Sequence, residues 1–482
     1  MHVLTRMLAC VACGFAFIVA VPLLGSTADA VAVDRGIVDH RLETAWGVDL
    51  AQVPAMAQEM GSRGLRAKWT RILVHWAKLQ PLEPGTSSPD DKNGDGYADS
   101  YVEELHTVVD ALHMQRIKVI LTVTEVPKWA SDRELWHHPP WASYGTGYSP
   151  IYAMDADDPA VLSQFGALGT FLAKSFGPSV RHFECWNEPN LGGSFYPQSR
   201  PGAPSFGLRI YVKMLRAFHS GVRRVTSQAV VIAGATSPRG ANDDFSTMPA
   251  TFAKYLRDHG AGRYFEGYSC HVYPWGAPGL TPFKPRSAVT LGNLDALIKY
   301  FPKKSFYVTE FGYSTEAPTQ LGQTVSETDQ ARYLRQAYSL TARRYKQVKT
   351  ILWFMVHDLD SIDGGVGISM GLKRVDGSLK PSWFAFAGGN ALSLAAPAAV
   401  GSSAWFNLSG ALTTRVPGAS AGRGVQLQRR RPGQARWQQL SAVVTEPDGS
   451  FGFRVMQASG VWLYRVVWDG VCESSKATVR TR

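Results

Sequence analysis

The chain has 482 residues, which is enough for one domain of roughly 250 residues or more and a second, smaller one. Hydrophobic residues make up 45% and charged residues 18%, so the composition is that of a globular protein and excludes a disordered chain or a coiled coil. Much of the net charge of +11 comes from the C-terminal end, where residues 401–482 hold eleven Lys and Arg residues against four Asp and Glu residues.

The first thirty residues have the features of a secretory signal peptide. A basic start at Arg6 is followed by an apolar run to Leu24 and by an A-x-A cleavage site that ends at Ala30. An uncleaved membrane anchor is the alternative, although the run is barely as long as the roughly 20 residues that cross a bilayer. No later segment has a comparable apolar run. We therefore expect a secreted protein that has no membrane span once residues 1–30 are removed.

Eight short β-branched runs follow, and they alternate with longer segments of helical periodicity. The runs cover residues 45–50, 69–76, 117–124, 180–187, 229–236, 265–273, 305–312 and 350–357. The helical candidates include residues 101–115, 160–176, 207–225 and 327–345. Eight strand–helix units in about 350 residues predict an α/β fold, a (β/α)8 TIM barrel, over residues 31–392. A doubly wound open sheet is the competing architecture, but no GxGxxG follows the first strand.

The C-terminal region changes to short strands separated by turns. Residues 393–403 are small and read as a linker, and no helix of useful length fits residues 404–482. This pattern predicts a small all-β, immunoglobulin-like sandwich with an accessory role. Its basic surface suits an anionic wall polymer, and a solvated arginine-rich surface without a partner is the alternative. An exported protein without a recognisable nucleic-acid-binding module is not expected to bind nucleic acid.

Two glutamates lie where barrel chemistry takes place, at the C-terminal ends of strands. Glu188 follows the fourth run in HFECWNEPNL, and Glu310 ends the seventh run in SFYVTEFGYS. A single strand-end glutamate is more often structural. A pair that faces one cavity is the arrangement that glycoside hydrolysis needs, because one carboxyl group protonates the leaving oxygen while the other attacks the sugar or activates water.

The strings WNEPN (186–190) and EFGYS (310–314) resemble the retaining glycoside hydrolases of clan A, nearest to families 39 and 5, over roughly residues 43–390. In that clan the acid/base glutamate follows an asparagine directly, and Asn187 occupies that place here. The resemblance implies that Glu188 is the acid/base and Glu310 the nucleophile. The loop after the second strand departs from family 39, where a short PxPGxY link is usual.

Further positions match the same clan. The resemblance implies that His271 and Tyr273 in CHVYP line the site, with the tyrosine donating a hydrogen bond to the nucleophile, and that Trp353 forms the floor of the sugar site. Arg71 matches the arginine of the second strand, although it could instead pair with Glu184 inside the barrel.

Chemical reasoning on the residues themselves adds two roles. Asn187 can hydrogen-bond the sugar 2-hydroxyl, a contact that strengthens in the transition state. Trp275 is a loop aromatic that can stack on a sugar ring, and the alternative is that it only holds its loop against the barrel. For His271 the alternative is a structural histidine in the barrel wall.

The segment DKNGDGYAD resembles the start of a calcium-binding loop. Asp91, Asn93, Asp95 and Asp99 stand at positions 1, 3, 5 and 9 of an EF-hand-like pattern, with Gly96 at the sharp turn. Position 12 is a valine, so the usual bidentate glutamate is missing. We expect a structural calcium ion, and a plain turn with solvated carboxylates is the alternative.

These patterns together predict a secreted glycoside hydrolase. It would cleave O-glycosidic, β-linked bonds of a polysaccharide or oligosaccharide by double displacement through a covalent glycosyl-enzyme intermediate, with no cofactor for catalysis. A carbohydrate-binding or cell-wall-binding protein that lacks turnover is one alternative, and a transglycosylase is another. The presence of both glutamates favours an enzyme.

Overall fold

The computed structural model describes residues 33–44, 47–137, 149–281, 287–316, 324–360, 367–456 and 458–481. The predicted signal peptide, residues 1–30, lies outside these ranges. Among the helices within them, none combines the length and the apolar character needed to cross a membrane.

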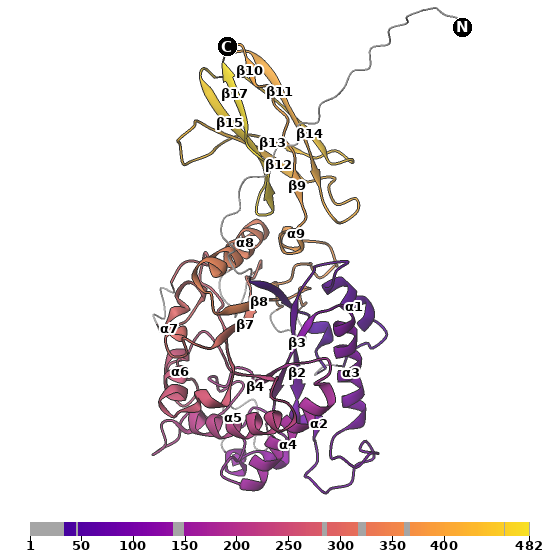
Figure 1. Cartoon of the computed structure of the whole chain (residues 1–482), viewed down its shortest axis with the longest axis vertical. Helices are drawn as coiled ribbons and strands as arrows, with labels where there is room; N and C mark the ends of the chain where they lie inside the picture. Colours follow the sequence, from indigo (N-terminus) through magenta and orange to yellow (C-terminus); the bar gives the residue numbers. More distant parts are fainter. Residues whose placement is uncertain are drawn as a thin grey trace, which may run out of the picture.

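Eight parallel strands close into a barrel in sequence order, which confirms the predicted (β/α)8 fold (Figure 1). They are β1 (Asp34–Val38), β2 (Trp69–His75), β3 (Lys118–Thr124), β4 (His182–Cys185), β5 (Val230–Thr236), β6 (Gly267–His271), β7 (Ser305–Phe311) and β8 (Val348–Phe354). The ring closes where β1 pairs with β8 from Asp34↔Thr350 to Val38↔Phe354.

The first strand differs from the prediction, which placed it at residues 45–50. Strand β1 lies earlier, and residues 47–50 form exposed or half-buried irregular structure. Gly36 packs closely against β8, since an added Cβ there would lie 2.8 Å from the side chain of Leu352. This packing requires a glycine in the middle of a short strand, and the strand therefore lacks the continuous β-branched run from which the other strands were predicted.

Helices surround the barrel (Figure 1). They are α1 (Val53–Met60), α2 (Trp76–Leu79), α3 (Asp99–Met114), α4 (Pro159–Phe176), α5 (Phe206–Val225), α6 (Pro249–Asp258), α7 (Asp295–Ile298), α8 (Glu327–Arg344) and α9 (Pro381–Ala387). The Asp158 side chain caps α4 by accepting from the Ala160 N–H, and Pro159 begins that helix. Helices α4 and α5 approach closely, since a Cβ on Gly221 would lie 1.9 Å from the Gly166 carbonyl oxygen.

The barrel interior changes from apolar to charged along the strands. Trp69, Ile120 and Ile232 belong to one buried apolar cluster. Two residues further along β2 and β3, on the same face of each strand, stand Arg71 and Thr122. Polar side chains therefore fill the barrel toward the C-terminal ends of its strands.

Two sheets follow the barrel, as predicted for a small all-β domain. One has the order β10-β17-β15-β12-β13 with β16 beside β15, and the other has the order β14-β11-β9. The strands are β9 (Ala391–Leu392), β10 (Ala399–Val400), β11 (Trp405–Thr413), β12 (Gly424–Arg430), β13 (Gln438–Val444), β14 (Ser450–Met456), β15 (Val461–Trp468), β16 (Cys472–Glu473) and β17 (Ala477–Thr481). Phe406 of β11 and Tyr464 of β15 join the two sheets, with ring centroids 5.8 Å apart.

The prediction that residues 393–403 form a linker is wrong. Strand β10 lies within it and pairs with β17, and Ala395 bridges to Ser409. The small residues of this segment therefore add backbone hydrogen bonds to the edges of the second domain, which begins before residue 404.

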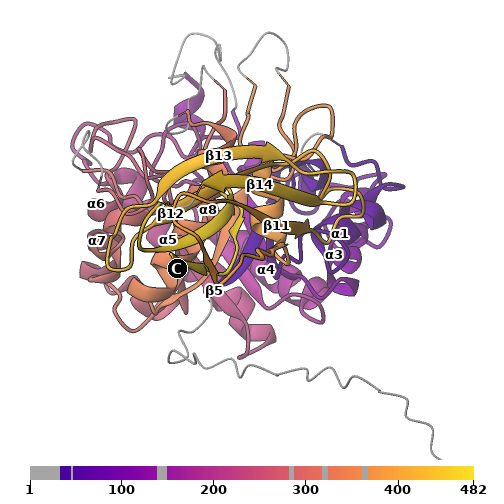
Figure 2. The ribbon, with the colours of Figure 1, turned by 90° about the horizontal axis from the view of Figure 1, so that it is seen from above.

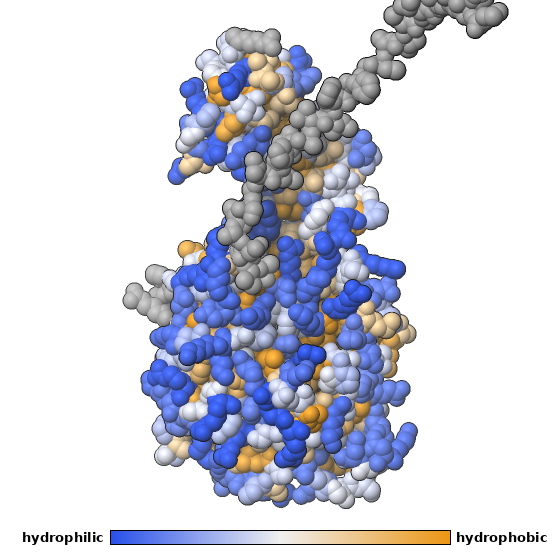
Figure 3. Space-filling model, viewed as in Figure 1, coloured by the Kyte–Doolittle hydropathy of each residue, from blue (hydrophilic) through white to orange (hydrophobic). Residues whose placement is uncertain are grey.

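The second domain packs against α8 and α9. Trp468 contacts Phe384 of α9 with ring centroids 5.0 Å apart, and Arg332 of α8 forms an ion pair with Asp469 at 3.1 Å. Figure 1 looks through the ring of barrel strands and shows the sandwich beside the ring, and Figure 2 shows the same molecule from above. Because the sandwich lies beside the ring, it leaves the strand ends of the barrel uncovered. The space-filling view in Figure 3 shows a mainly hydrophilic surface with scattered hydrophobic residues.

Candidate active site

Glu188 sits on a sharply turned loop directly after β4. Trp186 and Glu188 both have positive φ values, of 79° and 44°, and the Glu188 N–H donates to the Ala235 carbonyl at 3.1 Å. Buried Asn190 ties this loop to the loop after β5, because its side chain accepts from the Ser237 N–H at 2.8 Å. The backbone turn of the motif WNEPN therefore places Glu188 at the C-terminal end of the barrel.

Glu310 in β7 meets Glu188 at the same end of the barrel. One carboxylate oxygen of each glutamate and a ring nitrogen of His271 lie within 4.8 Å of one another. The Glu188 side chain is 21% exposed and that of Glu310 is 12% exposed, so a ligand can reach both. Retaining glycosidases hold their two carboxyl groups about 5–5.5 Å apart, whereas inverting enzymes need roughly 6.5–9.5 Å to admit a water molecule. Since one oxygen of each group lies within 4.8 Å of the other, the two groups are close enough for the retaining spacing.

Glu310 is held in its ionised form by its neighbours. The Tyr273 hydroxyl donates to Oε2 at 2.7 Å, and the Arg71 guanidinium donates to Oε1. Burial would raise the pKa of this carboxyl group, but His271, Arg71 and the Tyr273 hydrogen bond together hold the pKa of Glu310 below its usual value. Burial and the Glu310 charge raise the pKa of Tyr273 well above its usual value, so its hydroxyl remains a donor.

Arg71 lies at the centre of this network and is fully buried. Besides Glu310, its guanidinium donates to Asn187 Oδ1 at 3.2 Å and lies 3.8 Å from Glu184. Arg71 therefore lies in the site, as the resemblance implied, and also pairs with Glu184, so the two alternatives considered from the sequence occur together. Because the Asn187 oxygen is used inside the protein, its amide N–H groups remain as donors for a ligand.

His271 donates to Glu188 rather than accepting from it. Its Nε2 lies 3.0 Å from Arg71 Nη1, and an arginine can only donate, so Nε2 is the acceptor. Nδ1 is therefore the donor, and it lies 2.8 Å from Glu188 Oε1. This contact fixes one oxygen of Glu188 and leaves the other for an incoming ligand.

The two candidate sugar-stacking tryptophans lie outside this hydrogen-bonded network. Trp353 of β8 is fully buried, packs 5.8 Å from the ring of Phe311 and donates to the Met370 carbonyl at 2.9 Å. Trp275 follows β6, is half-buried and lies beneath the Arg239 guanidinium at 4.9 Å. The predicted role of Trp353 as the floor of the sugar site is wrong, because its ring has no exposed surface and packs in the core outside the barrel. Stacking of Trp275 on a sugar stays a prediction.

Three residues at the mouth of the barrel were not predicted. His75 lies on the same face of β2 as Arg71, and its Nδ1 is 3.1 Å from Oε1 of Glu125, which directly follows β3. Glu43 accepts from the Leu73 N–H at 3.3 Å, and burial raises its pKa to about 7 against the opposing charges of Arg71 and His75. Alternate residues of a strand share one face, so the position of His75 four residues after Arg71 in β2 would have indicated that it also points into the barrel.

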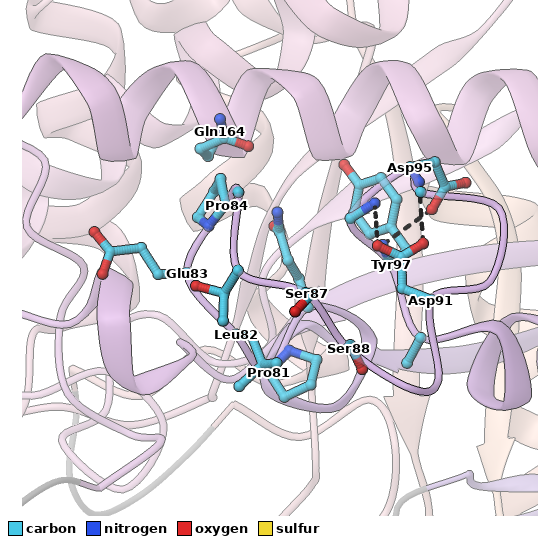
Figure 4. Close-up of a pocket in the computed structure, with 16 residues that line it drawn as sticks. Pro81, Leu82, Glu83, Pro84, Ser87, Ser88, Asp91, Asp95, Tyr97 and Gln164 are labelled. Carbon is cyan, nitrogen blue, oxygen red and sulfur yellow. Dashed lines mark hydrogen bonds between the residues drawn. The ribbon is translucent and has the colours of Figure 1, made fainter.

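The loop at residues 91–99 uses its carboxylates to bind its own backbone (Figure 4). Asp91 accepts from the N–H groups of Asp95 and Gly96 at 3.0 Å each, and Asp99 accepts from the Lys92 N–H at 2.7 Å. Together with residues 80–88, the loop lines a cavity of about 450 Å³. Over the described residues, three or more acidic, His or Cys side chains converge only at Glu188, His271 and Glu310. Calcium in the loop stays a prediction.

Several solved structures resemble this chain at low sequence identity. No curated protein matches the sequence. Among solved structures, the β-glucosidase of Pyrococcus furiosus is 14% identical over 70% of this chain and 83% of its own, with a TM-score of 0.47. The β-glycosidase of Thermosphaera aggregans is 13% identical over 70% and 84%, with a TM-score of 0.46. A β-1,3-glucanosyltransferase of Rhizomucor miehei is 12% identical over 72% and 96%, with a TM-score of 0.40.

A family match covers the barrel itself. Residues 34–356, which contain all eight barrel strands, match the family described as Cellulase (glycosyl hydrolase family 5). This chain therefore belongs to glycosyl hydrolase family 5 and is a glycoside hydrolase of the retaining clan A.

Proposed function

We propose that Glu310 is the nucleophile and Glu188 the acid/base of a retaining hydrolase that acts on β-linked O-glycosides. The observation that carries this assignment is the unequal environment of the two carboxyl groups. Over the described residues, Glu310 accepts hydrogen bonds from Arg71 and Tyr273 and has a lowered pKa, whereas Glu188 accepts one from the His271 side chain. Environments that separate two carboxyl groups in this way assign the base and the acid.

The first step forms the glycosyl ester. A carboxylate oxygen of Glu310 attacks the anomeric carbon while the bond from that carbon to the leaving oxygen breaks. The proton of Glu188 passes to the leaving oxygen, so the leaving group departs as a neutral alcohol. The free amide N–H of Asn187 can donate to the sugar 2-hydroxyl as positive charge develops on the ring.

The second step releases the sugar. Once Glu310 is an ester its negative charge is gone, and Glu188 can then remain ionised and accept a proton from water. The water oxygen bonds to the anomeric carbon, the ester bond breaks and Glu310 is again a carboxylate. Two inversions give net retention, and a sugar hydroxyl in place of water would give transglycosylation. Carboxyl groups complete both steps, so the proposal requires no cofactor.

We propose further that the protein is exported and acts on a polysaccharide or oligosaccharide. The signal-like residues 1–30 support export. The family description as a cellulase supports a polysaccharide substrate. N-terminal sequencing of the protein recovered from the culture medium tests the first point, since export with cleavage predicts a chain that begins at Val31.

The substrate is tested by incubating the protein with a panel of polysaccharides and aryl glycosides and separating the products by chromatography. Glu310→Gln serves as the matched control because it keeps the size of the side chain and removes the charge. Cleavage by the wild type alone supports the proposal. Binding without cleavage by both proteins would instead support a carbohydrate-binding protein without turnover.

A further inference from the structure

Glu125 directly follows β3 at the C-terminal end of the barrel and has an unusual backbone. Its φ is 60°, a left-handed conformation that strains any residue other than glycine. Thr122 and Thr124 precede it on the inward face of β3, so a regular strand would direct Glu125 outward. The left-handed turn instead brings its carboxylate to His75, whose Nδ1 lies 3.1 Å from Oε1. A strained backbone thus holds this carboxylate at the mouth of the barrel.

The histidine beside Glu125 is buried and has no other use in the site. The His75 side chain is 5% exposed, and neither ring nitrogen makes a hydrogen bond within the part of the chain that the structure describes. A buried polar group without a hydrogen bond costs stability, so its retention requires a reason. The Glu125 side chain is 33% exposed. The pair therefore presents a carboxylate to solvent and keeps the imidazole behind it.

This pair adjoins the catalytic network. His75 lies four residues after Arg71 on the inward face of β2, and Leu73 between them is partly exposed, so an open cleft borders this face. Burial raises the pKa of Glu43 to about 7, and the charges of Arg71 and His75 oppose that rise, which places Glu43 near both. A ligand in the catalytic site can therefore extend along β2 to Glu125.

Glu125 nevertheless stands apart from the reacting groups. It does not belong to the group of Glu188, His271 and Glu310, whose ligand atoms lie within 4.8 Å of one another. Along β2, four residues separate the arginine that holds Glu310 from the histidine that contacts Glu125, which is about 13 Å of strand. Glu125 is therefore placed to contact a sugar unit beyond the one whose bond is cleaved.

The chemistry of Glu125 suits sugar hydroxyl groups. No described residue donates a hydrogen bond to its carboxylate, so its capacity as an acceptor is unused. A carboxylate can accept from two neighbouring hydroxyl groups at once, and each such bond is roughly twice as strong as one between neutral groups. A glycan with free hydroxyl groups supplies the donors that this carboxylate lacks.

We propose that Glu125 is a specificity-determining residue that binds hydroxyl groups of a second sugar unit, and that His75 is the residue that positions it. The inference rests on the proposed hydrolysis of β-linked glycosides. A contact remote from the cleaved bond stabilises the bound substrate and the transition state alike, so it lowers KM and leaves kcat little changed. Substrates that reach Glu125 gain from this contact, and one-unit substrates do not.

The test compares nitrophenyl β-glycosides of one sugar unit with the matching five-unit oligosaccharides of glucose, mannose, xylose or galactose. The series that the wild type cleaves is used with Glu125→Gln, which keeps the size of the side chain and removes its charge. We expect kcat/KM to fall about tenfold more on the five-unit substrate than on the one-unit substrate, since hydrogen bonds to charged groups contribute about this factor or more. The loss should appear in KM.

Two further variants test the role of the histidine and the effect of charge. His75→Phe keeps a ring in the barrel wall and removes both nitrogens. Because His75 acts through Glu125, its variant should show the same dependence on substrate length, and the double variant should be no worse than the sum of neither contact, that is, no worse than Glu125→Gln alone. Glu103→Gln removes an exposed carboxylate from α3 and should change neither KM nor kcat. Glu125→Gln decides the outcome even where His75→Phe is unstable.

Two results would overturn the inference. The first is an equal loss on one-unit and five-unit substrates in Glu125→Gln, which would indicate a role in the bond change or in folding. The second is a Glu125→Gln variant with wild-type KM on the five-unit substrate. In both cases the wild type still cleaves its substrate, so the catalytic assignment stands. Cleavage of none of the four series by the wild type would contradict the proposed function itself, and this inference with it.

Discussion

Replacing Tyr273 with phenylalanine tests how Glu310 is kept ionised. The variant keeps the ring and removes one of the two hydrogen bonds that Glu310 accepts, the 2.7 Å contact to Oε2. A hydrogen bond to a charged group contributes about 1.5–3 kcal/mol. Since 1.4 kcal/mol corresponds to tenfold, the equilibrium of Glu310 shifts by about 10- to 100-fold from the ionised toward the protonated form.

The sign of the pH effect follows from this shift. The hydrogen bond lowers the pKa of Glu310, so its removal raises that pKa and moves the acidic limb of kcat/KM to higher pH. The assay is the pH profile of kcat/KM on an aryl glycoside. Tyr345→Phe is the control, because it removes a hydrogen bond to the remote Leu291 carbonyl and should leave the limb unchanged. An unchanged acidic limb in Tyr273→Phe would refute the proposed role.

Three further predictions concern separate parts of the molecule. Glu188→Gln should lower cleavage of unactivated glycosides by about 10²- to 10⁴-fold and spare aryl glycosides with good leaving groups, and equal losses on both would argue against an acid role. Calcium should raise the thermal midpoint if residues 91–99 bind it, and no change in calorimetry would remove that prediction. Gly221→Ala should cost about 1–3 kcal/mol of stability because its Cβ meets the Gly166 carbonyl, whereas Gly279→Ala, which has open space, should not.

The catalytic glutamates were predictable because their signals are local. Glu188 lies in a short motif whose backbone turn is set by its own residues, and Glu310 ends an apolar strand run. Their meeting also followed from the strand count, since the ends of parallel strands share one end of a barrel.

The connections between these residues depend on closure of the barrel. Arg71 and Glu310 are 239 residues apart and meet because β2 and β7 belong to one ring. The contact between His75 and Glu125 could likewise be predicted only once the inward-pointing faces of the strands are known. The predicted position of the first strand was wrong because the true strand, β1, depends on the tight packing of Gly36 against β8, and a hydrophobic pattern does not show such packing.

The central claim is that Glu310 forms a covalent bond with the sugar. The most direct measurement is to treat the protein with a 2-deoxy-2-fluoro aryl glycoside of the sugar that the substrate panel identifies, and to map the adduct by mass spectrometry after proteolysis. The assignment predicts one added glycosyl group on the peptide that contains Glu310, and none in Glu310→Gln. An adduct on a different carboxylate, or an adduct that persists in Glu310→Gln, would contradict it.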